Sequence, residues 1–210
     1  MSVRIKICGI TRVEDAEAAI ALGADMIGLN FYPPSPRCLT IERAREIRHA
    51  IGRRASVVGV FVNAAHDYIH EHLRELDLDL LQFHGDEDES ALRGWPVKVI
   101  RALRLRADTP NAALPVTAAD YTLLDTFHPS LYGGTGAARP LAGLARFDLT
   151  RVIISGGLVP DNVAAAAALR PFAIDVASGV ESAPGIKDSA KLRSFIANAK
   201  FSRANATSPR

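Results

Sequence analysis

Two side chains suited to acid–base chemistry stand at the ends of predicted strands. Cys8 ends the first β-branched run of the chain, and Asp125 ends another such run near its middle. A thiolate can remove a carbon-bound proton, and a carboxylic acid can protonate a departing oxygen. Both residues also have ordinary structural alternatives, because a lone cysteine is often a small buried hydrophobe and an aspartate can cap a loop.

Paired small residues predict an anion site. Gly156-Gly157 and Ser178-Gly179 follow the last two predicted strands. Glycine lets backbone N–H groups approach phosphate oxygens, and β/α barrels commonly bind phosphate in the loops after strands seven and eight. Each pair alone could be a plain turn, but the two together predict phosphate binding.

Arg37 is predicted to lie over the same site. It ends a loop with three prolines, residues 32–37, and such a stiff loop holds a side chain with little entropy to lose. A guanidinium fork suits a carboxylate, which favours an acidic group on the ligand. The alternative is an ordinary surface arginine.

Other polar groups are predicted to be structural. His66 and His70 have the i, i+4 spacing of a metal pair, but no third ligand of the usual motif accompanies them, so we expect a solvated helix face and no metal site. The acidic run at residues 86–89 has the form of a capping box that opens a helix. One member of a basic set could face an anionic substrate, and the others are expected to be solvated: Lys98, Arg101, Arg104 and Arg106.

The elements that must position these residues alternate between strand and helix. Strands are predicted at residues 3–8, 25–31, 56–62, 78–83, 97–103, 121–126, 151–155 and 172–177. Helices are predicted at residues 13–22, 41–51, 66–76, 86–93, 140–146, 160–169 and 189–199, with a weak signal at 108–119. Strands that alternate with helices form parallel sheets, and several of these strands are apolar throughout, as expected when both faces are buried.

Eight such units predict an α/β fold, an eightfold β/α (TIM) barrel in a single domain over residues 1–199, followed by a frayed polar tail at 200–210. A doubly wound open sheet is the alternative, but the first strand–helix turn lacks the glycine spacing of a dinucleotide site. Active sites of such barrels lie at the C-terminal strand ends. The polar residues and glycines expected there are Cys8, Arg37, Asn63, His84, Arg101, Asp125, Ser155, Gly156, Gly157, Ser178 and Gly179.

Composition excludes several classes of protein. The chain has 210 residues, 48% of them hydrophobic, and no apolar run long enough to span a membrane. A formal net charge of +2 gives no nucleic-acid footprint, and two cysteines are too few for a disulfide scaffold. The N-terminal residues lack the pattern of a signal peptide. We therefore expect a cytoplasmic protein with no nucleic-acid or membrane partner.

Short motifs along the chain, taken in order, resemble the phosphoribosylanthranilate isomerase family. The segment Lys6-Ile7-Cys8-Gly9-Ile10-Thr11 is similar to the family's opening signature. Further matches follow at Gly23-Ala24-Asp25, Asn30-Phe31-Tyr32, Ser35-Pro36-Arg37, Gly59-Val60-Phe61-Val62-Asn63, Leu81-Gln82-Phe83-His84-Gly85, Leu124-Asp125, Gly133-Gly134-Thr135-Gly136, Ser155-Gly156-Gly157-Leu158 and Asp175-Val176-Ala177-Ser178-Gly179-Val180-Glu181. Each motif alone is weak, whereas the set in this order is specific.

The resemblance implies a barrel enzyme that acts without a cofactor, as a monomer or a homodimer. Its reaction is an Amadori rearrangement in tryptophan biosynthesis, from N-(5-phosphoribosyl)anthranilate to 1-(2-carboxyphenylamino)-1-deoxyribulose 5-phosphate. By this resemblance Asp125 protonates the furanose ring oxygen, and Cys8 takes the proton from C2 of the resulting Schiff base. Asp125 must therefore hold a proton while Cys8 has lost its own.

The resemblance also implies how the two anionic ends of the substrate are held. Arg37 would bind the anthranilate carboxylate. The phosphate would be bound by the backbone of Gly156, Gly157, Ser178 and Gly179. His84 and Asp175 match family positions near the substrate. Two departures stand out: Ala177 replaces a usual serine, and residues 137–140 replace a lysine and an aromatic–acidic pair, with Arg139 as the candidate substitute.

Two other functions stay open. One is the histidine-pathway isomerase, which performs the same chemistry on a substrate with two phosphates. That family resembles an enzyme with two catalytic aspartates, one of them at the end of the first strand, where this chain has Cys8. This sequence also shows only one glycine-rich phosphate site. The other is a non-catalytic barrel that binds phosphorylated metabolites. The presence of Cys8, Arg37 and Asp125 together argues against it.

Overall fold

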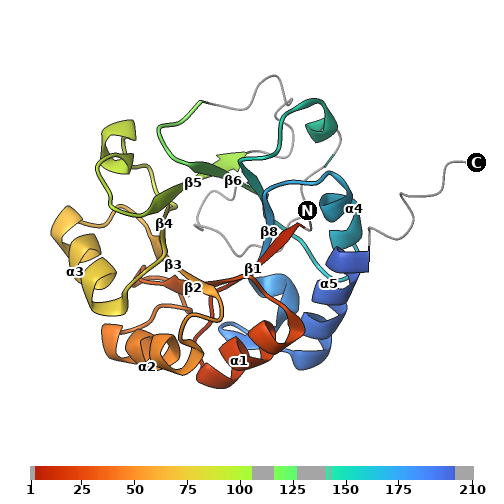
Figure 1. Ribbon diagram of the computed structural model, residues 1–210, viewed down its shortest axis with the longest axis horizontal. Helices are drawn as coiled ribbons and strands as arrows, with labels where there is room; N and C mark the ends of the chain where they lie inside the picture. The colour runs from red at the N-terminus through yellow and green to blue at the C-terminus, as the bar shows by residue number, and fades with distance from the viewer. Residues whose placement is uncertain (1–2, 106–115, 127–140, 142, 202–210) are drawn as a thin grey trace, which may run out of the picture.

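The computed structural model describes residues 3–105, 116–126, 141 and 143–201, and its centre is a closed barrel of eight parallel strands (Figure 1). The strands are β1 (Arg4–Cys8), β2 (Met26–Asn30), β3 (Ser56–Phe61), β4 (Leu80–Phe83), β5 (Lys98–Leu105), β6 (Tyr121–Thr126), β7 (Val152–Ile154) and β8 (Ala173–Val176). β8 pairs with β1, with Asp175 opposite Lys6, and this pairing closes the barrel. The predicted eightfold barrel is confirmed, and an open sheet is excluded.

Helices surround the barrel unevenly. α1 (Val13–Leu22), α2 (Ile41–Ile51) and α3 (His66–Leu76) follow the first three strands and have the predicted bounds. α4 (Val163–Ala168) and α5 (Ser189–Phe201) follow β7 and β8. Between β4 and β7 the described helical segments are two 3₁₀ turns, η1 (Glu89–Leu92) and η2 (Leu144–Arg146). In Figure 1, α1, α2 and α3 lie one after another along the lower left of the ring, with α4 and α5 on the right.

The predicted helix at residues 86–93 is wrong, since only the 3₁₀ turn η1 forms there. The capping box does not form because its two carboxylates have other partners. Glu89 accepts from the Ala118 N–H at 2.6 Å, and Asp86 pairs with Arg104. The helix predicted at 160–169 is also shorter than expected, and of the one predicted at 140–146 the described part is the turn η2.

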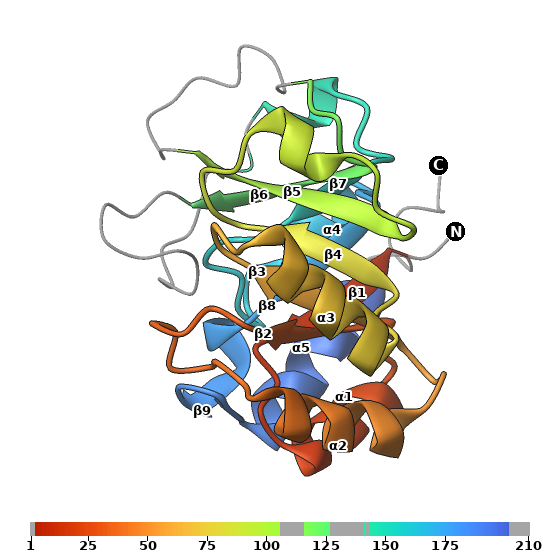
Figure 2. The same cartoon turned by 90° about the vertical axis from the view of Figure 1, so that its left-hand side faces the viewer.

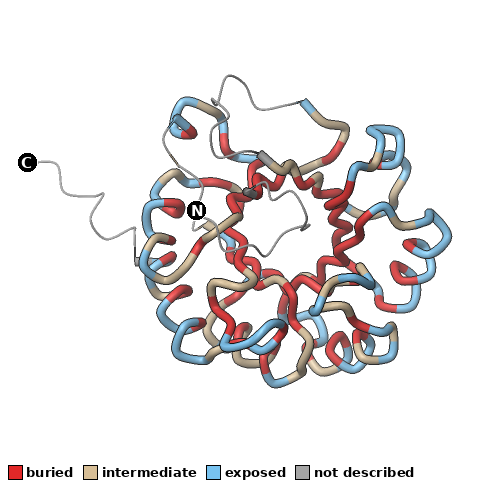
Figure 3. The backbone as a smooth tube through the Cα atoms, turned by 180° about the vertical axis from the view of Figure 1, so that it is seen from behind, coloured by how far each residue is buried: buried red, intermediate tan, exposed pale blue. Residues whose placement is uncertain are grey.

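Two layers of buried side chains stabilise the barrel. The larger packs the strands against the helices, and the smaller fills the inside of the barrel with Met26, Val58, Leu80, Ile100, Ala102, Leu123, Ile153 and Ala173. Inward-facing residues recur at every second position of a strand. The next inward positions toward the C-terminal ends are polar in several strands: Gln82, Asp125, Ser155 and Asp175. The barrel interior is therefore apolar at its lower part and polar toward the C-terminal ends of the strands. Figure 3 shows the buried residues gathered around the ring of strands.

A short antiparallel hairpin follows the barrel and is not predicted from the sequence. After β8 come the 3₁₀ turn η3 (Ser178–Val180) and the strands β9 (Glu181–Ala183) and β10 (Ile186–Lys187). Strands of three and two residues carry too little periodicity to be recognised. In Figure 2, β9 lies on the side of the barrel toward which β6 points, which is the side of the C-terminal strand ends.

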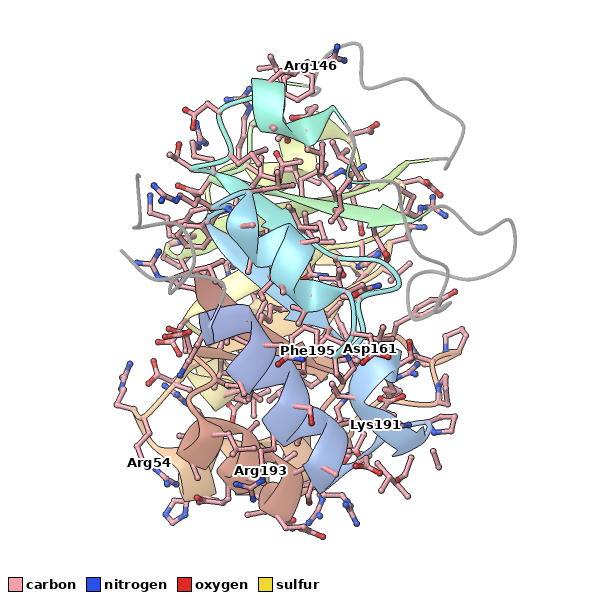
Figure 4. All side chains as sticks on the ribbon, turned by 90° about the vertical axis from the view of Figure 1, so that its right-hand side faces the viewer. Arg54, Arg146, Asp161, Lys191, Arg193 and Phe195 are labelled. Atoms are coloured by element: carbon pink, nitrogen blue, oxygen red, sulfur yellow. The ribbon has the colours of Figure 1, made fainter. Side chains whose placement is uncertain are left out.

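α5 packs against both α1 and α4, and so joins the first helix of the chain to the last two. Its inner face buries Leu192, Phe195 and Ile196. Figure 4 shows the helix from outside, with Lys191 and Arg193 at the surface. α5 runs two residues past its predicted end, and the rest of the predicted tail lies outside the described residues. No helix in the described ranges is long and apolar enough to cross a membrane.

Candidate active site

A cavity of about 320 Å³ lies at the C-terminal ends of the barrel strands. All nine residues predicted to react with or bind the substrate line it: Cys8, Arg37, His84, Asp125, Gly156, Gly157, Asp175, Ser178 and Gly179. Asn63 and Arg101 are not among its lining residues, because Asn63 accepts from the Asp86 N–H and Arg101 pairs with Glu87. Asn30 and Gln82 also line the cavity, and the inward alternation along β2 and β4 is the signal that could have found them.

Cys8 ends β1 with its thiol in the cavity. Its partner across the β1–β2 pair is Gly28, and a Cβ atom at Gly28 would lie only 2.8 Å from the Cys8 Sγ. Glycine at this position therefore leaves room for the thiol. Burial raises the pKa of Cys8, and the nearby Lys6 ammonium opposes this rise. Both Cys8 and Cys38 are free thiols.

Asp125 lies in the C-terminal part of β6 and is only 4% exposed. Its Oδ2 is 3.2 Å from His84 Nε2, and His84 Nδ1 is 2.9 Å from the Gln82 amide nitrogen. With the amide donating to Nδ1, the Nε2 atom carries the ring hydrogen and donates it to Asp125. Gln82 and His84, at the end of β4, thus fix the orientation of the Asp125 carboxyl group.

An ion pair lies inside the barrel next to Cys8. Lys6 is fully buried, and its Nζ is 2.8 Å from Asp175 Oδ1. The Ser155 hydroxyl donates to Asp175 Oδ2 at 2.9 Å. Both carboxylate oxygens of Asp175 therefore bind protein groups, and Asp175 lines the cavity as the partner of Lys6 in an ion pair.

Arg37 reaches the cavity with one edge of its guanidinium already bound. Its Nε and Nη2 donate to the two oxygens of Glu181 at 2.8 and 2.6 Å. Lys187 donates to Glu181 at 2.8 Å and also to the backbone oxygens of Cys8 and Ala177. The β9–β10 hairpin therefore holds Arg37 over the cavity. Within the described part of the chain, Nη1 is the guanidinium nitrogen without a protein acceptor.

The loops after β7 and β8 offer backbone N–H groups to the cavity. Gly156 and Gly157 both have positive φ, 81° and 64°, and neither N–H donates to an acceptor among the described residues. The second loop approaches the first closely, because a Cβ atom at Gly179 would lie 1.9 Å from the Leu158 carbonyl oxygen. N–H groups without a protein acceptor at adjoining turns are well suited to bind the oxygens of a phosphate.

The remaining candidates lie away from the cavity. The basic residues after β4 each have an acidic partner: Lys98 with Asp120, Arg101 with Glu87, and Arg104 with Asp86. The rings of His66 and His70 meet edge to face, and both rings lie tilted against the ring of Trp95. In the ranges that the structure covers, no three side chains form a group that could hold a metal ion. Arg106, Arg139 and the motif at residues 133–136 lie outside the described residues.

A cavity that holds a thiol and a carboxyl group at the C-terminal ends of a closed β/α barrel is typical of an enzyme active site. Comparison with known proteins gives the family. The chain belongs to the N-(5'phosphoribosyl)anthranilate (PRA) isomerase family, whose model matches residues 5–198.

Individual relatives match nearly the whole chain. The N-(5'-phosphoribosyl)anthranilate isomerase of Pseudomonas fluorescens (strain Pf0-1) is 47% identical over 198 residues, which are 93% of this chain and 97% of that protein. The crystal structure of the phosphoribosyl anthranilate isomerase from Thermus thermophilus matches with a TM-score of 0.82 and 39% identity, over 96% of this chain and 100% of that one. A phosphoribosyl anthranilate isomerase in complex with reduced 1-(o-carboxyphenylamino)-1-deoxyribulose 5-phosphate matches with a TM-score of 0.76 and 35% identity, over 95% and 99% of the two chains.

Proposed function

We propose that this protein catalyses the Amadori rearrangement of N-(5'-phosphoribosyl)anthranilate to 1-(2-carboxyphenylamino)-1-deoxyribulose 5-phosphate, a step of tryptophan biosynthesis, in the cytoplasm. The observation that carries the proposal is that Cys8 and Asp125 line one cavity together with Arg37 and two glycine-rich loops. These groups correspond to the reacting atoms, the carboxylate and the phosphate of this substrate. A reduced form of the same product is bound in one of the similar structures.

In the proposed first step Asp125 is the general acid. It gives its proton to the furanose ring oxygen while the bond between that oxygen and C1 breaks. The lone pair of the anthranilate nitrogen forms the C1=N bond of a protonated Schiff base. The contact with His84 at 3.2 Å keeps the carboxyl group oriented during this transfer.

In the proposed second step Cys8 is the general base. Its thiolate takes the proton from C2, the electron pair of the C2–H bond becomes the C1=C2 double bond, and the π pair of the imine returns to nitrogen. The imine is thus an electron sink within the substrate itself. The resulting enolamine tautomerises to the ketone, and exchange with solvent restores the proton on Asp125 and removes the one on Cys8.

The two anionic ends of the substrate position it between these groups. Arg37 offers Nη1 to the anthranilate carboxylate, while its other edge stays on Glu181. The loops at Gly156-Gly157 and Ser178-Gly179 take the phosphate through backbone N–H groups and the Ser178 hydroxyl. Because Ala177 lacks a hydroxyl, the backbone donors must supply most of the hydrogen bonds. His84 and Asp175 border the sugar between the two ends.

A coupled assay tests the proposed function. The substrate is generated in place from anthranilate and phosphoribosyl pyrophosphate by a transferase, the purified protein is added, and the loss of anthranilate-type fluorescence is followed. We expect a loss much faster than the spontaneous rate. A folded protein with reduced Cys8 that gives only the spontaneous rate contradicts the proposal, and the histidine-pathway substrate is then the next one to assay.

Arg37→Lys is expected to raise KM about tenfold to a hundredfold, the effect of one charge-assisted hydrogen bond, with a smaller change in kcat. Lysine keeps the positive charge but lacks the planar fork of arginine, which binds both oxygens of Glu181 along one edge and presents a separate N–H group to a carboxylate. The measurement is steady-state kinetics together with binding of the reduced product and of its analogue without the carboxylate. The wild type should prefer the carboxylated ligand strongly, and the variant should lose most of that preference. An unchanged preference would remove Arg37 from carboxylate binding.

Gly179→Ala is expected to weaken phosphate binding and to lower the free energy of unfolding by about 1–3 kcal/mol, the usual cost of overpacking. A Cβ atom at residue 179 would meet the Leu158 carbonyl oxygen at 1.9 Å, so one of the two loops must move away. Calorimetric titration of the reduced product measures binding, and urea unfolding measures stability. Retained affinity in a destabilised variant would show that Gly179 is structural only.

A further inference from the structure

The barrel interior holds a charge that the proposed acid and base do not account for. Lys6 lies two residues before Cys8 on β1, so both side chains point into the barrel, and Lys6 is fully buried. A lysine is almost never fully buried without a compensating charge, because desolvation of the ammonium is costly. Asp175 on β8 supplies that charge at 2.8 Å, and Ser155 at the end of β7 holds the other oxygen of Asp175. Three strands thus fix the position of one ammonium group beside the thiol.

The charges around Cys8 do not balance while the thiol is neutral. Lys6 and Asp175 form one neutral pair. On the other side, Arg37 and Lys187 share the single carboxylate of Glu181. The three cations and two anions therefore leave one uncompensated positive charge, and a thiolate at Cys8 would neutralise it.

We propose that Lys6 is a positioning residue of the reaction, whose buried ammonium, fixed by Asp175 and Ser155, stabilises Cys8 as the thiolate that accepts the proton. This inference rests on the proposed function, since it concerns the base of that reaction. It explains why a buried lysine stands beside a thiol that must lose its proton to act as a base.

The electrostatics of the three groups support this geometry. Burial raises the pKa of Cys8, Lys6 lowers it, and Asp175 raises it. For Lys6, burial lowers the pKa, but Asp175 and Cys8 together carry it above its ordinary value, so the ammonium stays charged. The two partners of the buried pair therefore act on the thiol with opposite signs.

Opposite signs give a test that a merely structural role would not pass. The thiol pKa of Cys8 is measured in a Cys38→Ala background from the pH dependence of alkylation by iodoacetamide and from the ultraviolet absorbance of the thiolate. Lys6→Met, which keeps most of the side-chain length without the charge, is expected to raise the thiol pKa by about one unit or more, and so to lower the alkylation rate at neutral pH about tenfold. Asp175→Asn is expected to shift the pKa downward. Shifts in the same direction, or no shift in Lys6→Met, would overturn the proposal.

A double variant separates the effect from damage to the fold. Lys6→Met leaves Asp175 buried without its partner, which destabilises a protein strongly. Lys6→Met combined with Asp175→Asn removes both charges. We expect this double variant to fold and to keep a thiol pKa above that of the wild type, because Lys6 lowers the pKa of Cys8 more strongly than Asp175 raises it. A double variant with the wild-type thiol pKa or a lower one counts against Lys6.

Kinetics connect the thiol to turnover. If Cys8 is the base, the acidic limb of the kcat/KM profile moves to higher pH in Lys6→Met by the same amount as the thiol pKa. If the thiol pKa shifts as expected in Lys6→Met but this limb does not move, the Lys6–Cys8 interaction is supported and Cys8 is rejected as the base. The titration thus tests the inference, and the pH profile tests the function on which it rests.

Discussion

Replacing Asp125 with asparagine is expected to lower kcat by about 10²- to 10⁴-fold, the contribution of a positioned general acid. Asparagine keeps the size of the side chain and an oxygen that can accept from His84, so the cavity should stay intact. What it loses is a proton that can pass to the ring oxygen. Steady-state rates with the substrate generated in place measure the effect, and binding of the reduced product should change little.

Asp120→Asn is the matched control for this change. Asp120 precedes β6, where it pairs with Lys98 and accepts from the Val99 N–H, and it does not line the cavity. The same chemical substitution a few residues away should leave kcat unchanged. If Asp125→Asn kept wild-type kcat, the proton would have to come from another group, and His84 would be the first to test.

Cys8→Ala is expected to cause a loss in kcat of similar size, about 10²- to 10⁴-fold, because alanine cannot accept the C2 proton that the Cys8 thiolate is proposed to take. The pH dependence provides a second measurement. Burial raises the pKa of Cys8, and only the thiolate can accept the proton, so wild-type kcat/KM should rise with pH through the titration of this thiol. This acidic limb should vanish in Cys8→Ala.

Cys38→Ala serves as the control. Cys38 is also a free thiol, but its Sγ faces the Leu39 carbonyl oxygen at 3.8 Å and it does not line the cavity. Its removal should leave both the rate and the pH profile as they are. Full activity in Cys8→Ala would reject Cys8 as the base. The next candidate base to test would be Asp175, the carboxylate that pairs with Lys6 beside Cys8.

Local signals explain why three helices have the predicted bounds. Gly23 and Asp77 adopt positive φ at the ends of α1 and α3, and Thr40 caps α2 by accepting from the Arg43 N–H. Each signal lies within a few residues of the boundary that it defines. The helix predicted at residues 86–93 fails for the opposite reason, since the carboxylates that imitate a cap bind partners 18 and 29 residues away.

The same distinction applies to the cavity. Cys8, His84 and Asp125 could be placed from the sequence because the C-terminal ends of parallel strands meet at one end of a barrel. The fixed edge of Arg37 could not, because its partner Glu181 is 144 residues away in a hairpin too short to recognise. In the sequence Lys6 is likewise a single polar residue in a β-branched run. Its role could not be predicted, because its partner Asp175 lies 169 residues later in the chain.

The bond from Lys187 to the Cys8 carbonyl oxygen has a consequence for how the enzyme is made. It joins residues 179 positions apart, so it can form only after the ribosome has synthesised almost the whole barrel. Until β8 is synthesised, the edge of β1 that pairs with it is left unpaired, and closing so long a loop carries an entropic cost that the completed ring of strands offsets. The backbone around Cys8 therefore acquires its contact with Lys187 only once the β9–β10 hairpin has been synthesised.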